Sequence, residues 1–183
     1  MRILSASFGA SDPDALTRWY EETLGVAAAF VPGERGPHHF AFHVADLAQW
    51  QARLELTQEY DFSSWGGARA AYFRDPEANV VELITRPQTH AELTLAEVGL
   101  PVADVRAAVD ALRREVGLEP YDEWDDSFAP LGDEDGLLIV VREGRNWFPF
   151  EVAAGPAPVT VTVDADRECD FVVPGSRHRV ISP

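Results

Sequence analysis

Two ionisable side chains, His39 and Glu97, occupy the same position in two runs of alternating character. In each run every second residue is apolar, and most of the residues between them are small or polar. Because a strand presents alternate residues to opposite faces, one face is apolar and the other carries the ionisable group among small neighbours. Such a surface indicates a concave face with room for a ligand. The simpler alternatives are a hydrogen-bonded core histidine and a solvated glutamate.

A third ionisable group, Glu82, lies between Val81 and Leu83 in an apolar run that is typical of a strand. A buried carboxylate is costly unless it is paired or bound to a metal ion. On an edge strand it could instead face water, so the run leaves both interpretations open.

Several kinds of chemistry are excluded by the residues that are missing. All 15 basic residues are arginines, so no lysine can form a Schiff base or serve a phosphate-binding loop. Cys169 is the single cysteine, which excludes an intramolecular disulfide and a zinc site built from thiolates.

The charge balance predicts which partners the protein avoids. The formal net charge is −16, so the chain should repel nucleic acid and anionic membrane surfaces. No run approaches the roughly 18 apolar residues of a membrane span, and no targeting segment is expected. We expect a cytoplasmic protein.

The elements that must position the ionisable groups recur along the chain. The tripeptide Val-Ala-Asp ending at Asp46 returns 58 residues later, ending at Asp104. The same offset relates Asp75 to Asp133 at the far end of the unit. An offset that is kept at both ends indicates two equivalent modules.

The repeat divides the chain into four parts. Residues 36–90 and 92–150 form two full modules, each with a strand, an Asp-capped helix and further strands, in the order βαβββ. Residues 1–35 form a partial βαβ copy. The tail, 151–183, contains strand-like runs that could complete the sheet of the partial copy. The fold class is therefore α+β.

Two segments resemble a known family. The run 72–84, Tyr-Phe-Arg-Asp-Pro-Glu-Ala-Asn-Val-Val-Glu-Leu-Ile, is similar to the closing motif of the vicinal oxygen chelate superfamily, which includes glyoxalases, bleomycin-resistance proteins and extradiol dioxygenases. The run 39–46 resembles its opening strand. Phrases at 61–65 and 144–149 are similar to a less characterised bacterial branch. The resemblance covers both full modules and implies curved mixed sheets around a cup.

The resemblance also implies a metal site. By position, the ligands fall on His39, Glu82 and Glu97, and the fourth place falls on Val140, which cannot bind a metal. One imidazole and two carboxylates suit a divalent ion such as Mn, Fe, Zn or Ni. A ring-cleaving dioxygenase would need two histidines, of which only His43 could be the second.

Other side chains are candidates for binding or moving a substrate. Glu82 or Glu97 could serve as the catalytic base, and His43 is expected as a polar group in the cup wall. Arg142 could hold a substrate carboxylate, although a surface ion pair is the simpler interpretation. Aromatic side chains could wall a substrate pocket or belong to the core: Trp65, Tyr72, Trp124 and Trp147.

Three functions remain open at this point. The first is a glyoxalase-like metal enzyme, of isomerase or lyase type, that acts on a small metabolite with vicinal oxygens. The second is a metal-free protein that binds or sequesters a small molecule. The third is a structural role in which the partial copy and the tail exchange strands between subunits, and a homodimer is expected in any case.

Overall fold

A computed structural model describes residues 1–87 and 93–183 of the chain. The predicted boundary between the two full modules, at 90–92, lies outside the described residues. The helices and strands follow in this order: β1 (Arg2–Ala10), α1 (Pro13–Thr23), β2 (Ala29–Pro32), β3 (His39–His43), α2 (Ala48–Gln51), β4 (Tyr60–Phe62), β5 (Ala68–Arg74), β6 (Val80–Thr85), β7 (Leu95–Val102), α3 (Val105–Glu115), β8 (Phe128–Asp133), β9 (Gly136–Arg142), β10 (Val159–Asp164), β11 (Cys169–Val172) and β12 (Arg179–Ser182).

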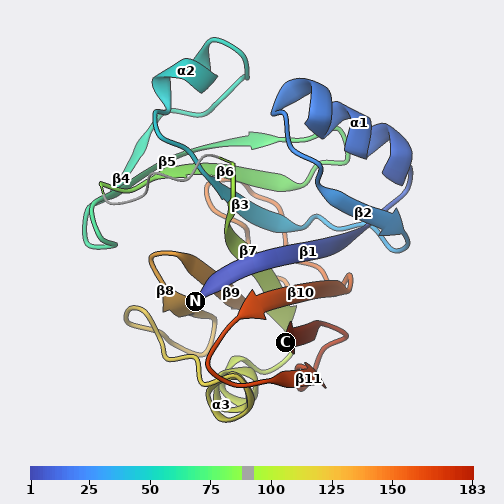
Figure 1. The fold of residues 1–183 in the computed structure, drawn as a ribbon, viewed down its shortest axis with the longest axis vertical. Coiled ribbons are helices and arrows are strands. Elements are labelled where there is room, and N and C mark those ends of the chain that lie inside the picture. Colours follow the sequence, from blue (N-terminus) through green and yellow to red (C-terminus); the bar gives the residue numbers. More distant parts are fainter. Residues whose placement is uncertain (88–92) are drawn as a thin grey trace.

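The strands form two sheets in an α+β arrangement (Figure 1). The larger sheet is curved and has seven strands in the order β4-β5-β6-β3-β7-β9-β8. Strands β3 and β7, which open the two full modules, are antiparallel neighbours at its centre. The two modules therefore build one continuous sheet within a single chain, and the opening strands bring both ionisable positions to its middle.

The five-stranded sheet unites the two ends of the chain, in the order β11-β12-β10-β1-β2. Strand β10 of the tail is antiparallel to β1, and the two strands lie side by side in Figure 1. The tail thus supplies strands to the partial copy of its own chain. In this single chain the strands pair internally, and both the exchange of strands between subunits and the expected homodimer stay predictions.

The second full module is shorter than the βαβββ pattern predicts. The first module has the complete set, β3-α2-β4-β5-β6, but the second has only β7, α3, β8 and β9. In place of a counterpart of β4 there is an isolated bridge between Pro120 and Leu131. Proline has no backbone N–H, so Pro120 and Pro130 interrupt the ladder that would extend this bridge into a strand.

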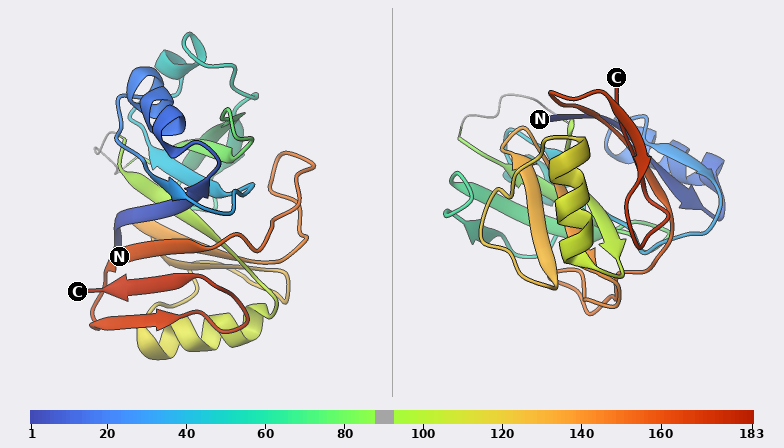
Figure 2. Two further views of the ribbon diagram at one scale, coloured as in Figure 1. Left: turned by 90° about the vertical axis from the view of Figure 1, so that its right-hand side faces the viewer. Right: turned by 90° about the horizontal axis from the view of Figure 1, so that it is seen from below.

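The two faces of the seven-stranded sheet have different surroundings. Its back face packs against the helices and the five-stranded sheet, and this larger core includes Phe40, Phe42, Val98 and Leu100, as their alternation predicts. Helices α1 and α3 lie at opposite ends of the molecule (Figure 2). The opposite face, the cup face, carries a second apolar cluster that includes Ala41.

Alternation with the buried residues Ala6 and Phe8 would place Leu4 on the apolar face of β1, but Leu4 is 51% exposed. The pairing of β1 with β10 shifts register between Ile3 and Ser5, so Ile3 is buried in its place. A shift of one residue moves a side chain to the other face of a strand.

Aspartates cap the two long helices. The side chain of Asp12 accepts a hydrogen bond from the backbone N–H of Ala15, at 3.0 Å, and Asp104 does the same for Ala107, at 3.1 Å. The helix expected after Asp46 is only the single turn α2, since its buried anchors are limited to Leu47 and Trp50. Among the described residues, no helix is long and apolar enough to cross a bilayer.

Candidate metal centre

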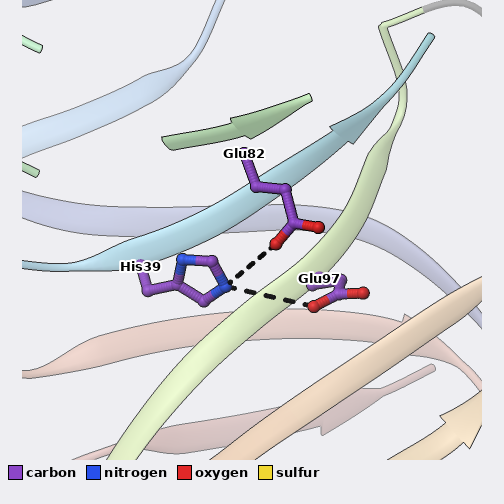
Figure 3. A group of neighbouring side chains, drawn as sticks. All are labelled: His39, Glu82 and Glu97. Atoms are coloured by element: carbon purple, nitrogen blue, oxygen red, sulfur yellow. Dashed lines mark ion pairs between the residues drawn. The ribbon is translucent and has the colours of Figure 1, made fainter. Parts of the chain in front are cut away.

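His39, Glu82 and Glu97 converge on the cup face from three neighbouring strands (Figure 3). The Nε2 atom of His39 is 3.6 Å from Oε2 of Glu82 and 3.9 Å from Oε2 of Glu97. All three side chains are buried. Glu82 therefore does not face solvent on an edge strand, and Glu97 is not the solvated side chain of the simpler interpretation.

The register of the central strand explains why the three groups meet. Strand β3 lies between β6 and β7, and Ala41 pairs with Glu82 on one side and with Glu97 on the other. The two carboxylates consequently flank a single methyl group. His39 stands two residues earlier on the same face of β3, so its ring can reach between them.

The tautomer of His39 follows from its second hydrogen bond. Its Nδ1 lies 3.1 Å from the backbone oxygen of Val80, and a carbonyl oxygen can only accept, so Nδ1 carries the hydrogen. In the form that can bind a metal, Nε2 then carries the lone pair and points toward two carboxylates. Three electron-rich atoms repel one another unless a cation or a proton lies between them. An orienting hydrogen bond of this kind is typical of metal-binding histidines.

The donor set fits a divalent ion on distance and charge. Two ligands bonded to one ion at about 2.0–2.2 Å are roughly 3–3.5 Å apart, so the 3.6 and 3.9 Å separations of the donor atoms need little adjustment. When both carboxylates are ionised, they and the cation Arg86 together carry one net negative charge. A divalent ion would reverse that excess and separate the two like charges.

Arg86 is a buried member of the site that the sequence analysis did not identify. Its Nη2 donates to Oε1 of Glu97 at 3.3 Å, and its Nη1 donates to the backbone oxygen of Glu134 at 3.4 Å. The ion pair occupies one oxygen of Glu97 and leaves the other facing His39. The signal was available, because Arg86 continues the alternation of Glu82 and Ile84 one step beyond the end of β6.

The electrostatics of the site reflect its burial. Burial raises the pKa of Glu82 well above the usual range of a carboxyl group, and the charge of Glu97 raises it further, while Arg86 and the Tyr72 hydroxyl oppose the shift. Burial and the same two carboxylates raise the pKa of Tyr72 well above its ordinary value. Tyr72 is therefore protonated at neutral pH and can donate a hydrogen bond.

The three side chains lie at a pocket with a volume of about 230 Å³. Of the predicted pocket residues, Trp65, Tyr72 and Trp147 line it, whereas His43, Trp124 and Arg142 do not. Further lining residues were not predicted individually, although three of them lie in the runs 61–65 and 144–149: Phe62, Ile84, Phe128, Ile139, Arg145 and Phe148. No local pattern marks them as a group, since they come from five separate stretches of the chain.

Trp147 is held against the site by neighbours on both sides. Its ring centroid is 5.1 Å from that of His39, and its indole N–H donates to the backbone oxygen of Pro37 at 3.1 Å. A Cβ atom added at Gly99 would approach the Trp147 ring to 2.6 Å. Because Gly99 has no side chain, the Trp147 ring can pack directly against β7 and form this wall of the pocket.

The structure corrects two expectations about β9, namely the fourth ligand position at Val140 and the pocket residue Arg142. The position opposite Gly99, equivalent to that of Glu82 in the first module, is held by Ile139, whereas Val140 faces the larger core. Arg142 has the same parity as Val140 and is exposed outside the pocket. The fourth ligand position still lacks a metal-binding side chain, because isoleucine, like valine, cannot bind a metal.

His43 is on the cup face but does not reach the metal-site residues. Its ring is buried, burial lowers its pKa, and within residues 1–87 and 93–183 neither ring nitrogen has a hydrogen-bond partner. The grouping of possible ligand atoms among the described residues contains His39, Glu82 and Glu97 without it. The two-histidine site that a ring-cleaving dioxygenase would need is therefore not assembled here.

Comparison with known proteins identifies the fold. The chain matches no family model and no curated protein sequence. Among solved structures it is similar to glyoxalase I from Zea mays, with a TM-score of 0.60 and 16% identity over 99% of this chain and 91% of the other. A variant of that enzyme gives a TM-score of 0.65 and 17% identity, over 99% and 93% of the two chains. A proposed dioxygenase from Bacillus subtilis gives 0.63 and 16%, over 91% and 71%.

Proposed function

Because the chain has the fold of the vicinal oxygen chelate superfamily, we propose that it is a glyoxalase-like metal-dependent enzyme. Its substrate would be a small metabolite with two neighbouring oxygen atoms, and its reaction a proton transfer of isomerase or lyase type. The observation that carries the proposal is the convergence of His39 Nε2 with two buried carboxylates at a pocket.

His39, Glu82 and Glu97 would hold the ion. A bound Mn, Fe, Zn or Ni ion would polarise a carbonyl oxygen of the substrate and make the neighbouring C–H bond more acidic. Three protein ligands would leave positions open for substrate oxygens.

The two glutamates are held differently, which suggests different roles. Glu97 is fixed by the ion pair of its Oε1 with Arg86 and would act as an anchor. Glu82 has its only ion-pair neighbour within the described part of the chain in His39, so its carboxylate has more freedom to reorient. Glu82 is therefore the better candidate for the base that takes a proton from the substrate and returns it to an adjacent atom.

The remaining pocket residues would orient the substrate and exclude water. The Tyr72 hydroxyl is a proton donor next to Glu82, and Trp147 covers His39. Apolar walls strengthen the electrostatic interactions inside the site because they keep bulk water out.

Metal analysis tests this proposal. Protein purified without chelator, or reconstituted with Mn, Fe, Zn or Ni, should hold one divalent ion per chain by elemental analysis. His39→Ala, Glu82→Gln and Glu97→Gln should each weaken binding by on the order of 100-fold or more, since the change removes a ligand. Glu143→Gln, an exposed glutamate outside the pocket, is the matched control and should bind normally.

A metal-free binding protein is the competing function, and the aromatic lining of the pocket favours it. If no ion of the panel binds and aromatic ligands still raise the melting temperature, the metal enzyme is excluded and the binding protein is supported.

A further inference from the structure

Arg145 is the only cation among the described residues that line the pocket. It follows β9 and is exposed, and no carboxylate of the described chain lies within 4.0 Å of its guanidinium group. Its backbone is fixed, because its N–H donates to Arg142 at 3.0 Å and its carbonyl oxygen accepts from Ala154 at 2.8 Å. A positive charge is thus presented at the pocket without an ion-pair partner in the described chain, while Asp125 lies close enough for the two charges to attract each other.

Aromatic contacts hold the guanidinium group of Arg145 in place. Its Cζ is 4.9 Å from the centre of the Phe128 ring, and that ring stacks on Trp65 with centroids 6.1 Å apart. A cation placed over an aromatic face keeps its N–H groups free to bind an anion. The protein as a whole carries a charge of −16, so an anionic ligand needs a local cation to enter here.

The size and lining of the pocket limit what can lie between Arg145 and the metal-site residues. Its volume is about 230 Å³, and a cavity of about 150 Å³ is known to hold benzene. The walls are aromatic, with Tyr72, Trp147 and Phe148 among them. One ring with a few substituent atoms therefore fits both the space and the chemistry of the walls.

We propose that the pocket binds a single-ring aromatic carboxylate whose opposite end carries two adjacent oxygen atoms, one of them a carbonyl oxygen beside the C–H bond that the proposed proton transfer requires. The carboxylate pairs with Arg145, and the two oxygens face His39, Glu82 and Glu97. This inference rests on the proposed function, because the adjacent oxygens need an ion at the three ligands. Arg145 is then a residue that determines specificity, and it does not take part in the chemistry.

Four probe molecules distinguish the contribution of the carboxylate to binding from that of the adjacent oxygens. 3,4-Dihydroxybenzoate is an unreactive mimic that carries both the charge and the adjacent oxygens. Its amide lacks the charge, benzoate lacks the adjacent oxygens, and benzamide lacks both. Each is titrated calorimetrically into protein loaded with Zn²⁺, which cannot oxidise a catechol, and into metal-free protein. Metal content is measured before and after each titration to detect removal of the ion by the catechol.

Arg145→Gln should weaken binding of 3,4-dihydroxybenzoate roughly three- to tenfold, the range of an exposed charge-assisted contact, and leave binding of the amide unchanged. Arg142→Gln is the matched control, since it removes the same charge outside the pocket. It should change neither affinity. Equal losses in the two variants, or equal affinities of acid and amide for the unaltered protein, would overturn the inference.

The two proposals can fail separately. If the protein binds no ion but benzoate still depends on Arg145, the metal enzyme is excluded and recognition of the carboxylate stands. If the ion binds and 3,4-dihydroxybenzoate is insensitive to Arg145→Gln, the metal centre stands and the assignment of Arg145 is wrong.

Discussion

The first full module supplies two of the three candidate metal ligands, His39 and Glu82, and the second supplies one, Glu97. His39 in β3 and Glu97 in β7 stand at equivalent positions. The strands beside them then differ, because β6 presents Glu82 to the cup where β9 presents Ile139. On the cup face, the two modules thus differ in chemistry at this pair of equivalent positions.

The difference coincides with the length of one turn. From equivalent strand pairs, Arg74 with Val80 and Gly132 with Leu137, the chain crosses between strands through five residues in the first module and four in the second. A change of one residue in a turn moves the following side chains to opposite faces. This is why a uniform offset of 58 points to Val140, while Ile139 holds the place.

The longer turn is itself a structural element that is built around Asp75. The carboxylate accepts hydrogen bonds from the Tyr20 hydroxyl at 2.8 Å, from the Asn79 amide at 2.8 Å and from the backbone N–H groups of Glu77 and Asn79 at 2.9 Å. It therefore ties α1 to the β5–β6 turn. The Asp-Pro-Glu-Ala-Asn part of the motif serves the fold, whereas Tyr72, Glu82 and Ile84 of the same motif line the site.

The largest effect is expected from breaking the first turn. Asp75→Ala would leave a buried tyrosine hydroxyl and a buried amide without their acceptor, which should cost about 3 kcal/mol or more in the free energy of unfolding. Asp133→Ala changes the corresponding, exposed residue of the second turn and should cost less than about 1 kcal/mol. Urea unfolding of both variants measures the contrast, and similar losses would show that the two turns carry equal weight.

A smaller effect is expected from making the second module more like the first. Ile139→His places a nitrogen donor at the position equivalent to Glu82 and should tighten metal binding about tenfold, since it adds a fourth ligand. Ile139→Leu keeps the apolar character and is the control. Competition with a metal-sensitive chelator dye measures both affinities. If the affinity of the histidine variant is unchanged, the side chain at position 139 does not reach the ion.

The sequence allowed a good part of this arrangement to be predicted, because period-two alternation is local. It placed Phe40 and Phe42 in the core, and the resemblance selected three residues that the structure brings together. The length of a turn is also local, but its effect on Val140 and Ile139 depends on pairing with β7. A constant offset of 58 residues between the modules does not account for the shorter turn, so it assigns the position to the wrong residue.

The rest of the pocket depends on contacts between distant parts of the chain. Arg145 and Trp147 belong to the segment after β9, which passes over the cup and returns to pair through the bridge from Asn146 to Ala153. Nothing in the residues 143–158 marks which face they will cover. The alternation of Glu82 and Ile84, continued by one step, predicts that Arg86 faces the cup. Arg86 lies one residue past the end of β6, and the predicted strand does not extend that far.

The modules also differ in how a buried histidine attaches each of them to the five-stranded sheet. In the first, His38 Nε2 lies 3.3 Å from the backbone oxygen of Gly9. In the second, His178 of the tail lies with Nε2 2.6 Å from the backbone oxygen of Pro101, and its Nδ1 accepts from the N–H of Val159 at 3.1 Å. Both nitrogens of His178 are used, and only the neutral ring can serve both contacts.

The smallest predicted effect is therefore the loss of the second attachment in acid. Burial lowers the pKa of His178, and the nearby Arg177 lowers it further, while the bond to Pro101 opposes the shift. Above pH 6.5 the ring is neutral in both folded and unfolded chains, and stability does not depend on it. Below that pH the unfolded chain takes up the proton first, so stability falls, by at most about 1.4 kcal/mol per pH unit. Unfolding in urea at pH 7.5 and 5.5 should show this fall, and His178→Gln, which keeps an acceptor and a donor without titrating, should reduce it. An equal pH dependence in the two proteins would place the acid-sensitive contact elsewhere, and the second module would then be held to the tail by apolar packing.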